Sequence, residues 1–199
     1  MARGYEGEEK RDKRQMILDA AVKVFSRHGY HEARMEEIAA EAGIGKGTIY
    51  EYFTSKLELF QEMLNKSREV YYDSLEIDDK KKLSLREKIY FLFLSHIQFC
   101  RENKELTRIV FWDTKIMDEE LKVWSYDKRK EKEKMFREEV REAIERREIR
   151  KVDPELVSLN VSGLLSALWA PITLDGWDVD PEELAEKLTD LIFAGLKPE

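Results

Sequence analysis

The distribution of proline is the feature that most limits what this chain can fold into. Its four prolines lie at positions 154, 171, 181 and 198, so the first 153 residues contain none. Over that length apolar residues recur at steps of three and four, and the alternation typical of β-strands is absent. We therefore expect an all-α protein of about nine helices.

Capping signals predict where several helices begin. Ser55–Glu58 and Ser84–Glu87 each have the spacing of a capping box. Asp153-Pro154 and Asp180-Pro181 each place aspartate at the N-cap and proline at the first helical position. We expect Pro171 to end or kink the helix that begins at Pro154, because proline has no amide hydrogen to donate.

Two short helices joined by a glycine turn are predicted in residues 34–53. The first covers residues 35–42 and the second residues 46–53, with Gly43-Ile44-Gly45 between them. Small or apolar residues at the crossing, Ala39 and Ile49, would let the two helices pack closely. This arrangement is a helix-turn-helix, whose second helix can enter the major groove of DNA.

The same glycines, beside a lysine and a threonine, could instead suggest a loop that binds a nucleotide phosphate. The dinucleotide fingerprint follows a strand, but a helix is predicted here and Thr48 replaces the third glycine. The Walker loop has its lysine after the last glycine, whereas Lys46 precedes Gly47. Both nucleotide templates fail on spacing and on context.

Residues 29–60, GYHEARMEEIAAEAGIGKGTIYEYFTSKLELF, resemble the DNA-binding domain of the TetR family of bacterial repressors. The resemblance extends over residues 11–66, and the remainder is similar only in architecture. It implies a three-helix, helix-turn-helix DNA-binding domain over residues 1–66 and a helical ligand-binding and dimerisation domain over residues 67–199. The function it implies is that of a dimeric regulator, a repressor that a small hydrophobic ligand releases from a palindromic double-stranded DNA operator.

The resemblance also implies which residues touch DNA. The positions that match are Arg34, Met35, Lys46, Gly47, Thr48, Tyr50, Tyr52 and Lys56. Lys46 and Thr48 would meet bases or phosphates, the tyrosines would pack on the sugar-phosphate backbone, and Lys56 would clamp a phosphate. Arg34 and Met35 stand where the family usually has a capping serine or threonine. Gly45 replaces the serine that usually caps the recognition helix.

The charge distribution is compatible with a DNA-binding N-terminal part. The formal net charge is −7, yet residues 1–68 hold 12 basic and 12 acidic residues, and residues 69–199 hold 23 and 30. Local potential rather than net charge decides whether a polyanion binds. A basic arm over residues 10–14 is either a further phosphate contact or a solvated tail.

Aromatic residues in the second half predict an apolar effector pocket. The candidate lining residues are Phe93, His96, Phe99, Cys100, Phe111, Trp112, Trp124 and Trp169. The alternative is an ordinary aromatic core, because a helical apolar stripe usually reflects packing. His96 and Cys100, four residues apart, could also form a metal pair or a Cys–His nucleophile. Because no further ligand and no orienting acid are evident, we expect no metal, no cofactor and no enzyme.

The last two helices are predicted to form a homodimer interface. The helix from Pro154 carries small residues such as Ser162, Gly163 and Ser166, and the final helix carries leucines. Two such pairs could form a four-helix bundle across a two-fold axis; alternatively, these helices pack within one subunit. A different function, a helical protein-interaction module with a non-functional headpiece, remains the alternative.

The remaining composition suggests a cytoplasmic protein. Cys100 is the only cysteine, so no internal disulfide can form. The N-terminus lacks the apolar core of a signal peptide. Uninterrupted apolar stretches such as residues 89–94 fall far short of the ~20 residues that span a bilayer, so we expect no membrane association.

Overall fold

Nine α-helices make up the part of the chain that this computed structural model describes, residues 2–75, 83–112 and 119–196. The side chains of residues 2–11 and of some residues between 112 and 128 are outside that description. The helices are α1 (Ala2–Glu32), α2 (Met35–Glu41), α3 (Lys46–Tyr52), α4 (Lys56–Ser74), α5 (Leu85–Glu102), α6 (Lys104–Trp112), α7 (Glu119–Glu145), α8 (Pro154–Thr173) and α9 (Pro181–Ala194). No strand occurs in these residues, and the all-α prediction is confirmed.

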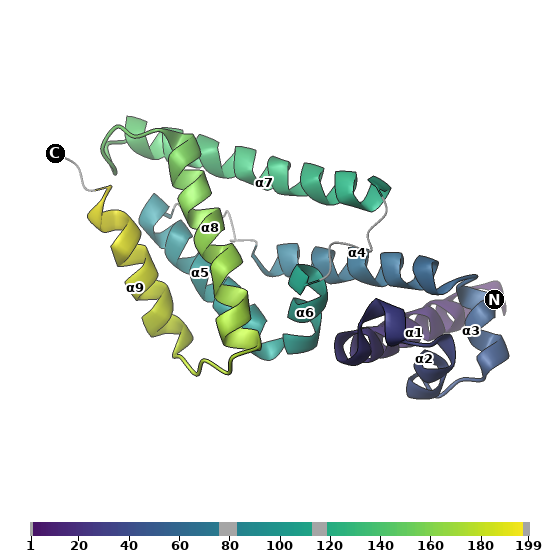
Figure 1. Ribbon diagram of the computed structural model, residues 1–199. Coiled ribbons are helices and arrows are strands. Elements are labelled where there is room, and N and C mark those ends of the chain that lie inside the picture. The colour runs from purple at the N-terminus through teal and green to yellow at the C-terminus, as the bar shows by residue number, and fades with distance from the viewer. Residues whose placement is uncertain (1, 76–82, 113–118, 197–199) are drawn as a thin grey trace.

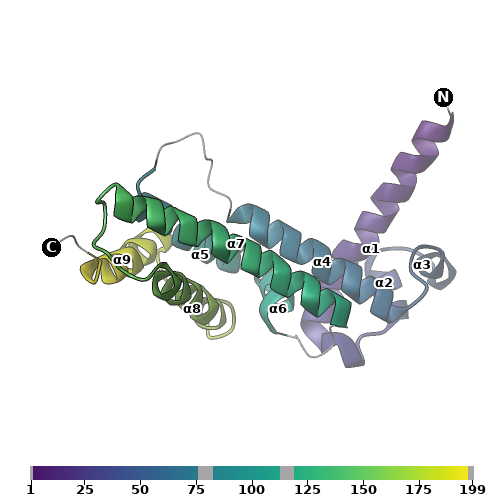
Figure 2. The ribbon, with the colours of Figure 1, turned by 90° about the horizontal axis from the view of Figure 1, so that it is seen from above.

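The helices form two groups that α4 and α6 connect (Figure 1). Helices α1, α2 and α3 form a headpiece at one end, and α5, α7, α8 and α9 form a bundle at the other. Helix α4 runs from the headpiece toward the bundle, and α6 lies between the two groups. The first turns of α1 project beyond the headpiece (Figure 2).

Side-chain caps begin several helices as the sequence predicts. Ser84 Oγ accepts from the Glu87 amide at 3.3 Å and the Glu87 carboxylate accepts from the Ser84 amide at 2.7 Å, which completes a capping box. Asp153 and Asp180 accept from backbone amides at the starts of α8 and α9.

Two local predictions need correction. Ser55 Oγ accepts from the Glu58 amide at 3.1 Å, but the Glu58 carboxylate accepts from the Thr54 amide at 2.7 Å, so only half of the predicted box forms. Pro171 does not end α8, which continues to Thr173. It lies in the last turn, where the Leu174 amide still donates to the Ala170 carbonyl at 2.8 Å.

Three apolar clusters hold the described helices together. The first fills the headpiece, where Ile17, Ile38 and Ile49 are fully buried, and it includes Ile109 from α6. The second joins α5, α7, α8 and α9 around residues such as Phe93. The third is smaller and lies between α4, α5 and α6. Because Ile109 belongs to the headpiece cluster, α6 connects the headpiece directly to the rest of the molecule.

Helix α8 is more apolar than the sequence analysis allowed for. By length and composition alone it could cross a membrane, the one such helix in the described part of the chain. Only 33% of its apolar window is buried within this subunit. A core or interface helix of a soluble protein can have the same composition. Because most of the apolar window is not buried, α8 presents an apolar face that one copy of the chain leaves uncovered.

Candidate nucleic-acid interface

The α2–turn–α3 segment has the geometry of a helix-turn-helix. Gly43 adopts φ +68°, a left-handed conformation that favours glycine, and so turns the chain at the end of α2. The next amide, that of Ile44, donates to the Ala39 carbonyl at 2.9 Å. Ile38 and Ile49 are fully buried where the two helices meet the headpiece core. The position of α3 is therefore set by packing on the core.

Helix α3 presents the predicted contact residues of the recognition helix at the surface. Lys46, Gly47 and Tyr50 are exposed and Thr48 is half-buried. A Cβ added at Gly47 would meet nothing within 4 Å, so this part of the helix surface is open. Tyr52 is also half-buried, but its ring packs against the headpiece core. The structure thus brings Lys46, Gly47, Thr48 and Tyr50 together on one short helix.

The Met35 side chain does not lie on the surface where a DNA contact was predicted. Its side chain is 5% exposed and belongs to the headpiece core. The apolar side chain gains more from burial than it would from facing water or phosphate at the start of α2.

The Lys56 side chain, predicted to clamp a phosphate, is engaged within the headpiece in this structure. The Lys56 ammonium donates to the carbonyl oxygens of Tyr30 at 2.7 Å, His31 at 3.0 Å and Ala33 at 2.9 Å. An ammonium has three hydrogens, so these carbonyls use all of its donors. Its nitrogen also lies 4.6 Å from the centroid of the Tyr30 ring. Lys56 therefore ties the start of α4 to the end of α1.

The start of α2 lacks a side-chain cap, as the sequence indicates. Arg34 is the N-cap residue and makes no side-chain cap hydrogen bond. Its backbone amide instead donates to the Glu37 carboxylate at 3.1 Å. The Arg34 side chain is exposed and is available to a ligand outside the headpiece.

Arg14, from the predicted basic arm, is part of the headpiece structure. Its guanidinium donates to the Tyr52 carbonyl and to the Glu62 carboxylate, both at 2.8 Å, and lies 4.3 Å from the centroid of the Phe53 ring. It therefore holds the end of the recognition helix against α1 and α4. The side chains of Lys10 and Arg11 are outside the described residues.

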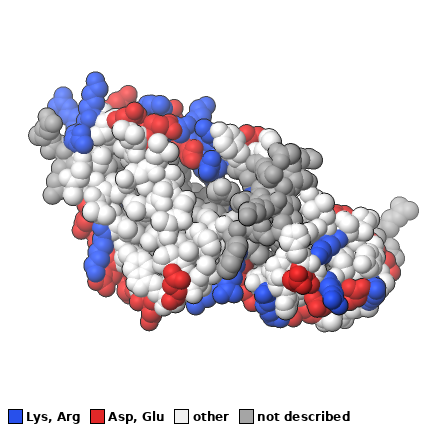
Figure 3. Space-filling model, in the orientation of Figure 1, with Lys and Arg blue, Asp and Glu red and all other residues white. Residues whose placement is uncertain are grey.

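The face of the headpiece that is seen in Figure 3 carries both signs of charge rather than a uniform basic patch. Within the candidate interface, Lys46 Nζ lies 2.6 Å from Glu36 Oε1 of α2. This hydrogen bond lowers the pKa of Glu36 and raises the pKa of Lys46. Sequence reasoning missed Glu36, because its proximity to Lys46 depends on the angle between two helices.

Part of the predicted effector set, His96, Phe99, Phe111 and Trp169, meets in an aromatic cluster between α4, α5, α6 and α8. The Phe111 ring stacks on Trp169 with centroids 5.8 Å apart and meets His96 edge-on at 5.9 Å. Tyr71 of α4, which the sequence analysis did not single out, contacts Phe99 at 5.2 Å and Phe111 at 5.1 Å. The side chains of Trp112 and Trp124 are outside the described residues. Phe93 and Cys100 are buried in the neighbouring bundle core.

His96 and Cys100 are in contact but are not arranged for catalysis. The distance from Cys100 Sγ to His96 Nε2 is 3.6 Å, and the Tyr71 hydroxyl lies 2.9 Å from His96 Nδ1. Burial lowers the pKa of His96 to about 4 and raises the pKa of Cys100 to about 12. At neutral pH the imidazole is a poor base and the thiol stays protonated, so neither group is activated. Among the described residues, no group of three or more potential ligands could hold a metal ion.

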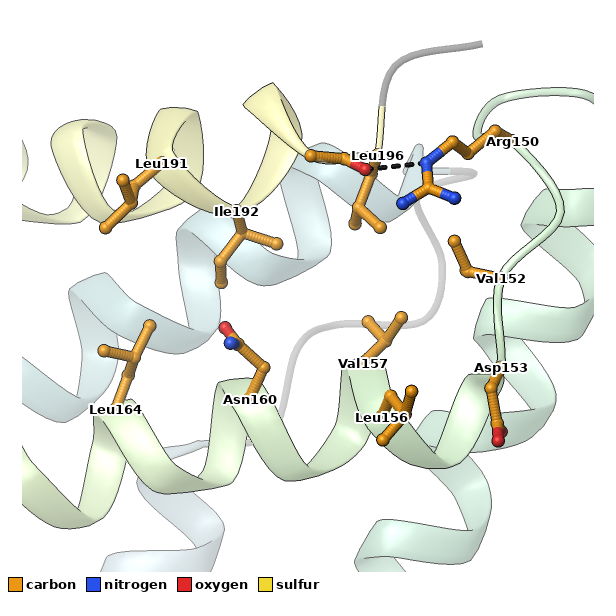
Figure 4. A pocket seen from close by; sticks show the side chains of 11 residues that line it. Arg150, Val152, Asp153, Leu156, Val157, Asn160, Leu164, Leu191, Ile192 and Leu196 are labelled. Carbon is orange, nitrogen blue, oxygen red and sulfur yellow. Dashed lines mark hydrogen bonds between the residues drawn. The ribbon is translucent and has the colours of Figure 1, made fainter. Parts of the chain in front are cut away.

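A groove of about 470 Å³ lies between the first half of α8 and the end of α9 (Figure 4). Its walls are mostly aliphatic, with Leu156 and Leu164 on α8 and Leu191 and Ile192 on α9. None of the predicted effector residues lines it. It lies on the uncovered apolar face of α8 and α9, apart from the aromatic cluster.

Comparison with known families gives matches over both parts of the chain. The model described as bacterial regulatory proteins, tetR family, matches residues 17–63. The model described as tetracyclin repressor-like, C-terminal domain, matches residues 82–196, more than half of the chain.

Individual proteins agree with these matches. The chain is 32% identical to the fatty acid metabolism regulator protein of Bacillus subtilis over 98 residues, 49% of this chain and only 50% of that protein. It is 27% identical to the HTH-type transcriptional regulator YhgD of B. subtilis over 93% of this chain and 97% of the relative. The solved structure of FadR from B. subtilis in complex with stearoyl-CoA superposes with a TM-score of 0.74 at 23% identity, covering 91% of this chain and 98% of that one.

The helix-turn-helix geometry, the matching family models and the full-length relatives agree. The chain belongs to the tetR family of bacterial regulatory proteins and is a transcriptional regulator, not an enzyme.

Proposed function

We propose that this regulator is a homodimeric repressor that binds a palindromic operator and releases it when a long-chain acyl-CoA thioester binds. The exposed recognition helix carries the proposal: Lys46, Gly47, Thr48 and Tyr50 lie together on α3, which the headpiece core positions. Arg34 and Tyr52 flank them as further contacts. One short helix reads few base pairs, so useful specificity requires two headpieces on two half-sites.

The uncovered face of α8 and α9 supports the homodimer. Leu156, Leu159 and Leu191 are 65%, 55% and 68% exposed in a single chain. Side chains of this kind on one continuous face mark an interaction surface. A second copy of the same face would bury them in a four-helix bundle with a two-fold axis.

In this proposal the two parts of the chain have different roles. Residues 1–66 form the DNA-binding domain, and residues 67–199 form the domain that binds the ligand and dimerises. Helix α4 crosses this boundary, since it runs from Lys56 to Ser74. A regulator that reads chromosomal DNA works in the cytoplasm, which is where we place it.

The ligand class is supported by the relatives and by the aromatic cluster. One relative is named a fatty acid metabolism regulator, and the similar B. subtilis structure contains stearoyl-CoA. The cluster of Phe99, Phe111 and Trp169 lies among four helices, where an acyl chain could replace ring-to-ring contacts. The ligand must bind the non-DNA-binding conformation more tightly, since equal affinity for both conformations would shift nothing.

Fluorescence anisotropy with a labelled duplex of the protein's own upstream region tests the proposal. We expect binding that weakens steeply with salt, as phosphate contacts require, and release on addition of stearoyl-CoA but not of free coenzyme A. A complex insensitive to salt would contradict the DNA-binding assignment. Release by coenzyme A alone, or no release by any acyl-CoA, would contradict the ligand class.

A further inference from the structure

The ion pair between Glu36 and Lys46 joins the two helices of the candidate DNA interface. Glu36 is in the first turn of α2 and Lys46 opens α3, so the pair bridges the two helices of the motif. Both side chains are exposed, Lys46 to 65% and Glu36 to 48%. The pair is therefore on the surface that would approach DNA rather than within the core.

Glu36 is ionised at neutral pH, so the surface holds a fixed negative charge. The hydrogen bond from Lys46 is the largest cause of its lowered pKa, and the charge of Arg34 acts in the same direction. The first turn of a helix also favours a carboxylate. Glu36 thus neutralises a lysine that would otherwise be free to contact a phosphate.

Stability alone does not account for an acidic residue at this position. An exposed ion pair contributes little to folding, because water already solvates both charges. A carboxylate that faces DNA is repelled by the phosphates. To contact arbitrary DNA, Lys46 must therefore either break its ion pair with Glu36 or bring the Glu36 carboxylate close to the DNA phosphates.

We propose that Glu36 is a specificity-determining residue that restrains Lys46 and so weakens binding to non-operator DNA more than binding to the operator. At the operator, Lys46 meets a base edge, such as the O6 and N7 acceptors of guanine, that repays loss or rearrangement of the ion pair. On non-operator DNA the matching base edge is missing from the position that Lys46 reaches, so a phosphate contact alone must compensate for loss of the ion pair, and the restraint holds. This inference rests on the proposed function, because it assumes that α3 reads the operator.

The test compares Glu36→Gln with Glu41→Gln on both an upstream-region duplex and a random-sequence duplex. Glu41 is a matched control: it is also on α2, and it pairs with Lys23 and Arg27 of α1, each at 3.3 Å. Both substitutions change the net charge equally. Titrations across a range of salt concentrations give affinity and salt dependence together.

For Glu36→Gln we expect affinity for random DNA to rise about fivefold at about 0.15 M salt, the effect of one added phosphate contact. The salt slope should steepen by about one unit. Operator affinity should rise less, so the ratio of operator to random binding should fall severalfold. Glu41→Gln should leave that ratio unchanged.

A Lys46→Gln background shows whether the effect acts through the lysine. If Glu36 restrains Lys46, the substitution Glu36→Gln changes random-DNA binding little once Lys46 is gone. An effect that persists in that background, or one that Glu41→Gln reproduces, would overturn the inference. Failure of the unsubstituted protein to bind the upstream region would instead count against the proposed function, and the random-DNA arm still tests the restraint.

Discussion

Gly45 is the residue at which this recognition helix departs most simply from its family. It occupies the N-cap of α3 with φ −70° and ψ 151°, the extended conformation that a capping serine adopts. A Cβ there would meet only Thr48 Oγ1, at 3.8 Å, which is an ordinary contact. Nothing in the backbone or its surroundings therefore requires glycine.

We expect Gly45→Ser to stabilise the headpiece by about 0.5–1 kcal/mol. The hydroxyl supplies a cap worth a few tenths of a kcal/mol, and loss of glycine reduces the entropy of the unfolded chain. Thermal unfolding should show a rise in Tm of about 1–4 °C. Gly43→Ser is the control: φ +68° opposes any side chain, so the Tm should fall. Equal shifts for the two variants would refute this account.

Protonation of the buried His96 should destabilise the folded protein in acid. Its pKa of about 4 in the folded protein lies below the ordinary value of 6.5. As the pH falls, the unfolded chain therefore binds a proton at His96 before the folded protein does. The stability of the folded state that depends on neutral His96 is present in full above pH 6.5 and is lost as the pH falls toward 4. The loss is roughly 3 kcal/mol of unfolding free energy.

Chemical denaturation of the protein and of His96→Gln at several pH values measures this effect. Glutamine can also form a hydrogen bond with Tyr71, as donor or acceptor, but does not titrate. The difference in slope between the two proteins should approach one proton between pH 6.5 and 4. Parallel pH profiles would show that His96 does not titrate as its burial requires.

At the scale of elements, α8 and α9 expose large apolar side chains that packing within one chain does not cover. Two of the exposed leucines, Leu156 and Leu191, line the groove between the first half of α8 and the end of α9. Because water contacts these side chains in a single chain, covering them stabilises association rather than the monomer fold.

We expect Leu191→Glu to dissociate the dimer without unfolding the chain. Burial of an unpaired carboxylate in the interface should cost at least about 3 kcal/mol, which weakens association about a hundredfold. Sedimentation at micromolar concentration should detect monomers with unchanged helical circular dichroism. Val70→Glu, at a position 50% exposed on α4, is the matched control and should remain dimeric. If Leu191→Glu stays dimeric as well, the interface lies on another face.

For the whole molecule, α6 is the element that joins the DNA-binding end to the proposed ligand region. Ile109 packs in the headpiece core, and Phe111, two residues later, stacks on Trp169 of α8. A ligand that moves Phe111 therefore acts on the same short helix that contacts α1. Such contiguous packing is a physical route for coupling between the two sites.

Ile109→Ala should reduce the coupling between ligand and operator. Removal of the buried side chain should cost about 2–4 kcal/mol of stability, and it loosens α6 from the headpiece. The ratio of operator dissociation constants with and without stearoyl-CoA should move toward one. Ile89→Ala removes the same group from the bundle core, where Ile89 is fully buried. A similar ratio change in both variants would mean that lost stability, rather than α6, is responsible.

Local sequence signals were sufficient for most of the fold. Helix starts at Ser84, Asp153 and Asp180 follow from caps formed within a few residues. The helix-turn-helix and the surface position of Lys46 follow from short-range spacing in the same way. These features depend on neighbours along the chain, so the sequence by itself determined them.

Only the tertiary structure decided which of the candidate side chains remain available for binding. Met35 is drawn into the headpiece core, and Lys56 is occupied by three carbonyl oxygens at the end of α1. Glu36 meets Lys46 because two helices cross at a particular angle. Burial and ion pairing join residues that are far apart along the chain or on different helices. Their energies depend on three-dimensional distance, which spacing in a sequence does not specify.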